Sequence, residues 1–397
     1  MLPEGGARGR VRLRRADPGG RAYRVAASRR AGCPPRRAGT WGGRGAACCA
    51  PTCGRGVRMR IAILYDPGAD DWTPEDIRGV MKAVDEIGAI FGVMGHEVRK
   101  VPVRHDMRWF QVARRADLAF NLCEGVHGKS EWEEHVVGTL EFSGTPVTGA
   151  SLWTLAACRR KPIANALLRQ AGLPIPRWTV AQGKIEDDFP LPAIVKPAAE
   201  DASAGLDRGS VVSDRKALRA RVAAMTEQFD DVLVQEYISG REFNVGFVGN
   251  RVLPIAEIDF SRMPEGAWPI LTYAGKWEMG SLDDLGSVPV CPAVIPQKLA
   301  DRLLRIAELA WRTMQGKGYG RIDLRVDDQG RPWVLEVNPN PDLNDDAGLS
   351  RMARVAGWDY AELVRRIAEV ALREAQGTKA ARELLAPSRR PRPTRTA

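Results

Sequence analysis

Two short stretches decide the fold of this chain: Gly320-Arg321-Ile322-Asp323-Leu324 and Leu335-Glu336-Val337-Asn338. Both alternate apolar and polar residues, as strands with one buried face do. Between them, Asp327-Asp328-Gln329-Gly330 has the composition of a tight turn, in which Gly takes a positive φ without strain. Together these stretches predict an antiparallel hairpin over residues 320–338.

The polar side chains of this hairpin are expected to share one face. Alternation places Arg321 with Asp323 on the first strand and Glu336 with Asn338 on the second. If the hairpin is symmetric about Gln329-Gly330, Asp323 lies opposite Glu336, and Arg321 lies opposite Asn338. The apolar residues are then expected on the other face: Ile322, Leu324, Val326, Leu335 and Val337.

Asp323 and Glu336 at these positions predict a bound cation. Two carboxylates opposite each other across a ladder repel and destabilise the sheet. A divalent cation between them removes that penalty. Carboxylate and amide oxygens suit Mg²⁺, which usually arrives with nucleotide phosphates, and Mn²⁺ is the alternative ion. The competing interpretation is a solvated polar face, which is common in antiparallel sheets.

The net charge of +10 over 397 residues is unevenly distributed. The basic excess lies in residues 1–58 and 378–397, so the body between them is acidic. A nucleic-acid-binding protein that uses the Arg-rich arm is therefore a weaker interpretation. The length suggests two or three domains. No apolar run approaches the ~18 residues of a membrane helix, so the body is expected to be soluble and cytoplasmic.

Residues 1–58 are rich in Arg, Gly, Ala and Pro and lack a periodic apolar pattern, which predicts disorder. Met59–Tyr65 resembles a natural protein start on a first strand. We therefore favour the interpretation that residues 1–58 are not translated over a functional basic arm or a transit peptide. The cysteines of this segment match no zinc-binding spacing: Cys33, Cys48, Cys49 and Cys53.

Strand and helix signals alternate from Met59 onward and predict an α/β fold, with α+β character in the C-terminal part. Residues 59–150 are expected to form a parallel-sheet unit: strands Arg60–Tyr65, Glu97–Val101, Leu118–Asn121 and Pro146–Val147, with helices from Thr73 to Met94 and Ser130–Phe142. Residues 151–238 have these expected elements: helices Pro162–Ala171 and Asp214–Glu227, and strands Ala193–Pro197, Ser210–Val212 and Val232–Glu236. Residues 239–376 have these: a hairpin of Phe243–Val248 with Arg251–Ile258, helix Pro296–Gln315, the 320–338 hairpin and helix Tyr360–Arg373. Residues 377–397 are expected to be a disordered basic tail.

Lys196 ends the apolar run Leu191–Pro197, next to the loop Glu200–Gly209, whose small residues allow backbone amides to approach phosphate oxygens. A surface lysine beside a flexible hairpin is the alternative. Gly125–Ser130 looks like a phosphate loop at first. However, its glycines are separated by two residues, where a Walker loop has four, so we reject that interpretation.

The segment Val234–Glu242 reads as a strand that enters a bend and ends on a carboxylate. Backbone groups at such a strand end can pair with a purine edge, and Glu242 can bind ribose hydroxyls. A plain domain hinge is the alternative. Lys276 lies in a loop beside aromatic residues, where it contacts phosphate or makes a cation–π contact with Trp277.

These pieces together resemble an ATP-grasp ligase, and specifically the D-alanine–D-alanine ligase family. The resemblance covers Met59 to about Leu372. Each motif is weak alone, but their order and spacing are specific: Gly144-Thr145-Pro146-Val147-Thr148-Gly149, Arg160-Lys161, Ala171-Gly172-Leu173-Pro174, Val195-Lys196-Pro197, Gln235–Glu242, Gly320-Arg321-Ile322-Asp323 and Glu336-Val337-Asn338-Pro339-Asn340-Pro341. The resemblance implies three α/β domains, with ATP bound between the central and C-terminal ones, and suggests a homodimer.

The resemblance also assigns roles to matching positions. The nucleotide-binding candidates are Lys161, Lys196 and Lys276 for phosphates, Gln235, Glu236 and Ile238 for adenine, and Glu242 for ribose. The metal candidates are Asp323, Glu336 and Asn338, which would hold two Mg²⁺ ions. The catalytic candidates are Arg321, which would steady the acyl phosphate, Lys276, which would reach the γ-phosphate, and Ser203 in the loop expected to act as a lid.

The implied reaction joins a carboxylate to an amine through an acyl phosphate. The alternative is a nucleotide-binding protein without ligase turnover. Substrates are expected to be amino-acid-like, although this sequence departs from the family pattern on the amino-acid side. Asp201-Ala202-Ser203 stands where the family has a Gly-Ser-Ser run, Trp277 where it has a Tyr, Asp342 where it has a Gly, and Ala347 where it has a Ser. The loop Asp66–Asp71 also lacks the glutamate of the family, for which Glu75 is a candidate substitute. The two substrates need not be D-alanine, and an acceptor with an exposed amine or a cationic group would tolerate Asp342.

Overall fold

The computed structural model describes residues 58–70, 72–181, 185, 188–201 and 203–385, all within one compact unit, Val57–Ala397. The expectations for the N-terminal arm and for the end of the tail fall on residues 1–57 and 386–397, which lie outside the described residues. None of the helices in the described part of the chain is long and apolar enough to cross a membrane.

The N-terminal part contains the predicted parallel sheet, in the order β2-β1-β3. Its elements are β1 (Arg60–Tyr65), α1 (Pro74–Val93), β2 (Glu97–Pro102), α2 (Arg108–Ala113), β3 (Leu118–Asn121), a 3₁₀ turn (Ser130–Trp132) and α3 (Glu133–Ser143). Thr73 begins α1 through a reciprocal capping box with Asp76, which explains the strong helix signal there. The expected strand at Pro146–Val147 is reduced to a single bridge from Ala119 to Val147.

The central part is built on a four-stranded sheet with the order β4-β7-β5-β6. Its elements are α4 (Leu152–Arg159), α5 (Lys161–Gln170), β4 (Trp178–Ala181), β5 (Ala193–Pro197), β6 (Val211–Val212), α6 (Arg215–Thr226) and β7 (Val232–Glu236). The predicted strands at 193–197 and 232–236 and the cap at Asp214 are confirmed. The sequence analysis missed α4 and β4, which are short and lack a clear apolar period.

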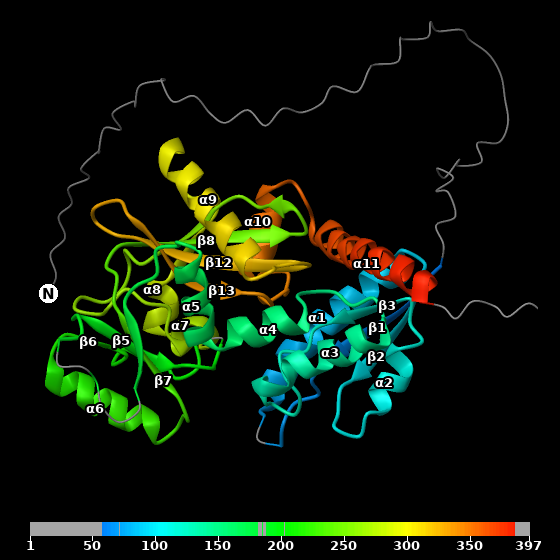
Figure 1. Ribbon diagram of the computed structural model, residues 1–397, viewed down its shortest axis with the longest axis horizontal. Helices are drawn as coiled ribbons and strands as arrows, with labels where there is room; N and C mark the ends of the chain where they lie inside the picture. The colour runs from blue at the N-terminus through cyan, green and yellow to red at the C-terminus, as the bar shows by residue number, and fades with distance from the viewer. Residues whose placement is uncertain (1–57, 71, 182–184, 186–187, 202, 386–397) are drawn as a thin grey trace, which may run out of the picture. The chain divides into compact units, whose positions relative to one another are not determined.

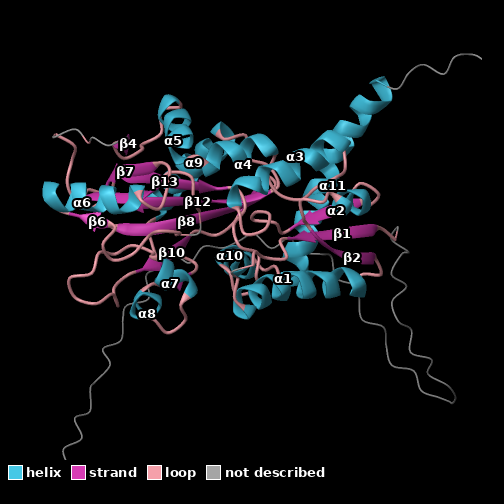
Figure 2. Cartoon of the chain, turned by 90° about the horizontal axis from the view of Figure 1, so that it is seen from below, coloured by secondary structure: helices cyan, strands magenta, loops and turns pink. Residues whose placement is uncertain are grey.

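The C-terminal part is built on a six-stranded sheet with the order β11-β10-β8-β12-β13, and β9 pairs with β8. Its strands are β8 (Arg241–Val248), β9 (Arg251–Val252), β10 (Ala256–Asp259), β11 (Val288–Val290), β12 (Tyr319–Val326) and β13 (Pro332–Asn338). Its helices are α7 (Tyr273–Trp277), α8 (Leu282–Gly286), α9 (Gln297–Thr313), α10 (Gly348–Val355) and α11 (Tyr360–Leu385). Figure 1 shows β8, β12 and β13 side by side, and Figure 2 shows α5 and α9 on one side of this sheet and α7 and α8 on the other.

Three expectations for the C-terminal part need correction. The predicted strand Arg251–Ile258 is interrupted, because only β9 and β10 within it pair with β8. The short elements α7, α8, α10 and β11 were not predicted. Helix α11 continues to Leu385, past the expected end at Arg373, because the residues that follow are mostly good helix formers. The expectation of a disordered tail from residue 377 is therefore wrong for residues 377–385. The three sheets fall one in each predicted segment, and the domain boundaries at 150, 238 and 376 stay a prediction.

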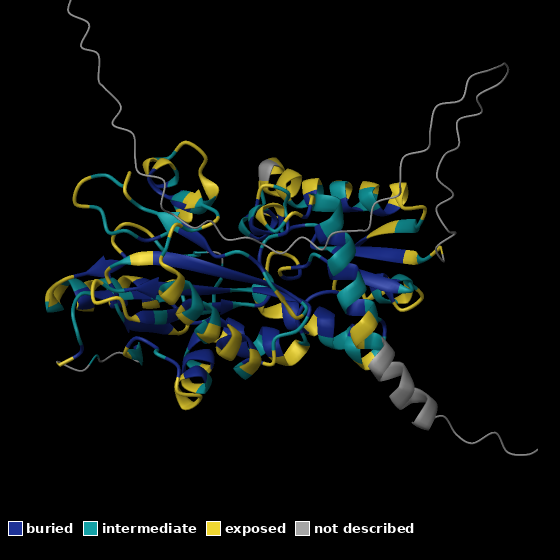
Figure 3. Cartoon of the chain, turned by 90° about the horizontal axis from the view of Figure 1, so that it is seen from above, coloured by how far each residue is buried: buried dark blue, intermediate teal, exposed yellow. Residues whose placement is uncertain are grey.

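A shared apolar core fixes the orientation of the 320–338 hairpin. Ile322, Leu324 and Val326 pack against the apolar face of α9, including Leu303 and Ala307, and all five residues are buried. The polar face of β12 must therefore point the other way. Figure 3 shows the same division across the sheets, with dark blue strands and yellow outer helix faces.

The register of this hairpin agrees with the predicted pairs but not with the assumed symmetry. Asp323 lies opposite Glu336 and Arg321 opposite Asn338, as predicted. Beyond them the pairing shifts by one residue, to Leu324 opposite Val334, so Leu335 is an extra residue in a β-bulge. Leu335 therefore lines the pocket on the polar face instead of joining the core, and its predicted orientation was wrong.

Candidate active site

One pocket gathers the polar face of the hairpin with residues from the central sheet. Eleven of the twelve predicted site residues line it: Lys196, Ser203, Gln235, Glu236, Ile238, Glu242, Lys276, Arg321, Asp323, Glu336 and Asn338. The other lining residues are Ile194, Asp201, Leu206, Tyr237, Ile270, Leu271, Arg325 and Leu335. Residues far apart in sequence therefore meet in one place, and their individual roles remain a prediction.

The elements explain why these side chains converge. Lys196 lies on β5, Gln235 on the neighbouring strand β7, and Glu242 at the start of β8. Lys276 lies on α7, outside the sheets. The pocket measures about 130 Å³, less than the roughly 300 Å³ typical of ligand sites. Several of its charged side chains form ion pairs: Arg321 with Asp323, Arg325 with Glu242, and Glu336 with Lys161, which is not a lining residue.

Asp323 is bound by two neighbours on the same sheet, of which Arg321 neutralises its charge. Arg321 Nε and Nη2 lie 2.6 and 2.8 Å from Asp323 Oδ1 and Oδ2, and Asn244 Nδ2 donates to Oδ1 at 2.7 Å. Burial disfavours the charge of Arg321, but Asp323 outweighs this effect and raises the pKa of the guanidinium. Arg321 thus offsets part of the repulsion predicted between Asp323 and Glu336.

Lys161 neutralises Glu336 from behind the pocket. Its Nζ lies 2.9 Å from Glu336 Oε1 and 3.2 Å from Asp201 Oδ1, and it also donates to the carbonyl of Glu200. Burial opposes the charge on Lys161, yet Glu336 and Asp201 raise its pKa. In turn, burial would raise the pKa of Glu336, but Lys161 and Lys196 lower it, so this carboxyl is ionised at neutral pH.

Lys196 and Lys276 are the more easily deprotonated lysines of the pocket. The pKa of Lys196 is lowered to about 8, chiefly by burial; Glu336 opposes the change, and Lys161 contributes to it. Burial and then Arg321 lower the pKa of Lys276. The cation–π contact between Lys276 and Trp277 that the sequence suggested is present, with Nζ 4.9 Å from the centre of the ring. The same lysine also lines the pocket.

Arg325 is a pocket residue that the sequence analysis missed. Its Nη2 donates to Glu242 Oε2 at 2.5 Å and to the carbonyl of Pro269 at 2.7 Å, and its Nη1 donates to the carbonyl of Ile238 at 3.1 Å. Glu242, the ribose candidate, is therefore held from the neighbouring strand. Strict alternation places residue 325 on the same face as Arg321 and Asp323, so the signal was present in the sequence.

Glu124 is a second missed residue, on the loop after β3. Desolvation raises the pKa of Glu124 to about 7, Lys276 opposes this shift and Asp342 adds to it. Asn340 joins this loop to the end of β13, because its Nδ2 lies 3.3 Å from the carbonyl oxygen of Cys123 and 2.7 Å from Glu133 Oε1. The sequence of residues 125–130 excludes a Walker loop and fits a strand-to-helix loop, an interpretation that does not single out Glu124.

The loop of residues 125–130 is held by Asp66, which follows β1. Asp66 Oδ1 accepts from the amides of Gly68 and His127, both at 3.0 Å, and Oδ2 accepts from the amide of Gly128 at 2.8 Å. Its carboxylate is therefore occupied by backbone donors. The candidate substitute Glu75 lies on α1, and its side chain is outside the described set.

The donor atoms of the hairpin suit a magnesium ion. Asp323, Glu336 and Asn338 offer carboxylate and amide oxygens from directly opposed strand positions, the ligand type that Mg²⁺ prefers. The described residues contain no group of three Asp, Glu, His or Cys side chains that could hold a metal ion.

Comparisons with known proteins identify the class and then the family. The crystal structure of D-alanine–D-alanine ligase from Bacillus anthracis complexed with ATP shares this fold, with a TM-score of 0.65, 23% identity and coverage of 81% of this chain and 99% of that one. The model of the D-ala D-ala ligase C-terminus matches residues 167–369, just over half of the chain. The chain therefore belongs to the D-alanine–D-alanine ligase family, which comprises ATP-dependent ligases with the ATP-grasp fold.

Relatives with moderate identity extend this match. The uncharacterized protein y4sG of Sinorhizobium fredii is 36% identical over 268 residues, which make up 66% of this chain and 76% of that protein. The D-alanine–D-alanine ligase of Dechloromonas aromatica is 32% identical over 260 residues, 64% of this chain and 81% of that protein. The predicted family, fold class and ATP-dependent ligase function are thereby confirmed.

Proposed function

We propose that this enzyme joins a small carboxylic acid or amino acid to an amine, with ATP as the energy source and an acyl phosphate as the intermediate. The observation that carries the proposal is the convergence of Lys196, Lys276 and Arg321 with Asp323 and Glu336 in one pocket. Positive side chains and carboxylates in this arrangement suit a triphosphate and its counter-ions. No residue is required as a covalent nucleophile.

The chain's own residues act by position and charge. Lys196 and Lys276 bind phosphate oxygens, and Arg325 holds Glu242 in place for the ribose. Asp323, Glu336 and Asn338 would hold Mg²⁺ or Mn²⁺, which neutralises charge on the phosphates when bound. Binding of the triphosphate replaces the internal pairs of Arg321 and Lys161, and Arg321 then becomes available to the reacting carboxyl group.

The adenine end of the pocket lies between the two sheets. Gln235 and Glu236 lie at the end of β7, with Ile238 just beyond, and Leu335 contributes an apolar surface from the opposite side. Gln235 is 2% exposed, and its Nε2 has no hydrogen-bond partner among the described residues. A purine edge is a suitable partner for this buried amide.

We further propose that the acceptor is an amine with cationic character. Glu124 and Asp342 both act electrostatically on Lys276, which places two acidic groups near the phosphate end of the pocket. Asp342 is itself fixed, because its Oδ1 accepts from the backbone and side-chain nitrogens of Asn344 at 2.8 and 2.9 Å. Acidic groups beside an amine site favour an ammonium group over a second carboxylate.

The test is a phosphate-release screen of purified enzyme with ATP over pairs of amino acids, small acids and amines, with the product mass measured. We expect release only when a suitable acid–amine pair is present. Full turnover with D-alanine alone at millimolar concentration would contradict the proposed acceptor class. Tight ATP binding without release on the whole panel would favour the nucleotide-binding alternative. A size measurement on the same sample tests the expected homodimer.

A further inference from the structure

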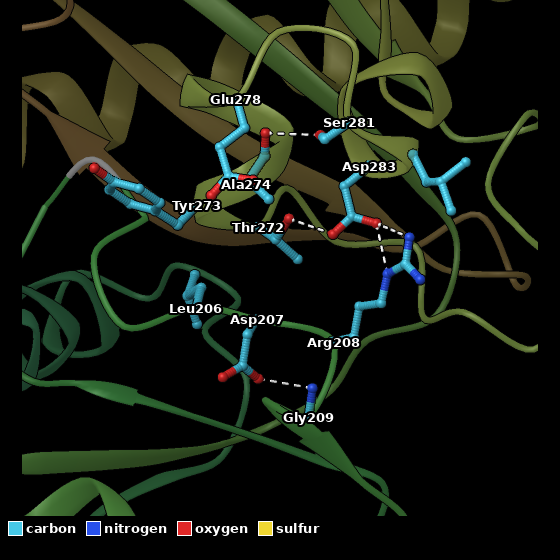
Figure 4. Close-up of a pocket in the computed structure, with 11 residues that line it drawn as sticks. Leu206, Asp207, Arg208, Gly209, Thr272, Tyr273, Ala274, Glu278, Ser281 and Asp283 are labelled. Carbon is cyan, nitrogen blue, oxygen red and sulfur yellow. Dashed lines mark hydrogen bonds and ion pairs between the residues drawn. The ribbon is translucent and has the colours of Figure 1, made fainter.

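An ion pair joins the loop of residues 198–209 to the segment that carries Lys276. Arg208 Nε and Nη2 lie 2.8 and 2.7 Å from Asp283 Oδ1, beside a hollow of about 550 Å³ (Figure 4). Asp283 is 4% exposed, whereas half of the Arg208 side chain is accessible to solvent. Because the carboxylate is buried and charge-assisted hydrogen bonds are strong, we expect this ion pair to be stronger than one between two exposed side chains.

Asp283 also organises the segment around Lys276. Its second oxygen, Oδ2, accepts from Thr272 Oγ1 at 2.7 Å, and Thr272 caps α7 by accepting from the Gly275 amide at 3.0 Å. Helix α7 has five residues, too few to hold a helical position on their own. The contacts thus run from Arg208 through Asp283 and Thr272 to the short helix that carries Lys276.

Two more contacts join the same loop to the start of α7. Ser203 Oγ donates to the carbonyl of Leu271 at 3.0 Å, and the Tyr273 amide donates to the carbonyl of Leu206 at 2.9 Å. These bonds dock the loop but do not involve Asp283. Among these contacts only the Arg208–Asp283 pair joins two charged groups, and Asp283 also accepts from Thr272, the residue that caps α7.

We propose that Arg208 and Asp283 are positioning residues that couple docking of the 198–209 loop to the placement of Lys276. The inference rests on the proposed function, in which Lys276 contacts the transferred phosphate. Without the ion pair the loop still covers the pocket through its other bonds, but α7 is no longer tied to it through Asp283. Lys276 is then less often in place when the nucleotide is bound, so the chemical step slows more than ATP binding weakens.

The first test compares Arg208→Ala and Arg208→Lys with a matched control, Arg262→Ala, which removes an exposed arginine elsewhere. We expect Arg208→Ala to lower kcat about tenfold, since small misplacements of a catalytic group are costly, and to change the KM for ATP less than about twofold. Arg208→Lys should recover part of the loss, and the control should match the parent enzyme. An equal loss in the control, or a loss confined to the KM, would overturn the proposal.

The second test is a double-mutant cycle with Lys276→Ala. If Arg208 acts through Lys276, then Arg208→Ala should cost less than about twofold in a Lys276→Ala background, because coupled sites are not additive. If the two losses multiply, Arg208 acts by another route and the proposal is wrong.

A third measurement separates this inference from the proposed function. Amide hydrogen exchange over residues 271–286 is followed in the presence of a non-hydrolysable ATP analogue. We expect faster exchange in Arg208→Ala than in the parent and in Arg262→Ala. Unchanged exchange contradicts the coupling whether or not turnover is found. If no acid–amine pair releases phosphate, the proposed function fails, and the exchange rates still decide whether the ion pair holds α7.

Discussion

The two sides of the proposed active site are built in different ways. The side proposed for the nucleotide is formed by strands β5, β7, β8, β12 and β13, which carry ion pairs. The side proposed for the acid and the amine consists of loops that do not line the pocket itself, around Glu124 after β3 and around Asp342 after β13. Strand positions tolerate little change, whereas loop residues can be replaced without loss of the fold. The difference explains why the sequence keeps the family pattern on the first side and departs from it on the second.

The largest expected effect is on the strand side. Glu336→Gln removes the charge that pairs with Lys161 and faces the proposed cation. We expect kcat/KM to fall at least about 100-fold, the usual scale for loss of one preorganised electrostatic group. The measurement is steady-state phosphate release, with the melting temperature followed to exclude unfolding.

The matched control for Glu336→Gln is Asp328→Asn, in the exposed turn of the same hairpin. Because surface substitutions rarely change stability by more than about 0.5 kcal/mol, this control should behave like the parent enzyme. A Glu336→Gln enzyme as active as the control would mean that the strand side does not hold the phosphates.

The second expected effect is a pH dependence that originates in Lys196. Its pKa is lowered to about 8 by burial, so the ammonium that binds phosphate is present below pH 8 and is lost above it. We expect kcat/KM for ATP to fall about tenfold per pH unit above that value, since this ratio reports ionisations of the free enzyme. A pH profile of the parent enzyme from pH 6.5 to about pH 10 measures it.

Lys196→Arg sharpens the same test, because a guanidinium stays charged throughout this range. Whatever its absolute rate, the variant should show no fall in this region of the profile. If parent and variant fall together, the titrating group is elsewhere, and Lys276, whose pKa is also lowered by burial, becomes the first residue to test.

The third expected effect concerns the loop side. Asp342→Gly removes one acidic group near Lys276 and introduces the residue type of the family pattern. The preference for a cationic acceptor over a neutral one should fall by up to about fivefold, the scale of one partly solvated ion pair. Competition between two acceptors in one reaction measures it directly. A preference unchanged in Asp342→Gly and in Glu124→Gln would place amine recognition outside these loops.

The smallest expected effect is from deletion of residues 1–58. If the catalytic unit begins near Met59, the KM for ATP and the melting temperature should remain those of the full chain. If the body is acidic, binding to polyanions should disappear once the basic tail of residues 378–397 is removed as well. Polyanion binding that survives both deletions would show that the charge argument is wrong.

Most of the strand side could be predicted from sequence because strands follow a period of two. Alternation placed Arg321, Asp323, Glu336 and Asn338 on one face, and the assumed position of the turn gave their cross-strand partners correctly. The bulge at Leu335 was missed although the adjacent apolar residues Val334 and Leu335 interrupt the alternation, because an apolar side chain suits either a buried face or the wall of a pocket. The internal ion pairs of the site were also missed, because Lys161 meets Glu336 only through tertiary packing.

The loop side could not be derived by the same reasoning. Glu124 and Asp342 are brought together by contacts between segments far apart in sequence, such as that of Asn340 with Cys123. No local period encodes such contacts. Short elements such as α7 and α8 were missed for a related reason, because five-residue helices depend on caps and neighbours more than on propensity.

The bulge in β13 has a consequence for how this enzyme could diversify. If Leu335 were absent, Val334, Glu336, Val337 and Asn338 would alternate without interruption, and Glu336 would still face Asp323. Leu335 is therefore a supernumerary side chain that reaches the pocket without disturbing the residues on either side of it. The shape of the pocket at this point can change by substitution of this single residue, while the acidic residues beside it keep their positions.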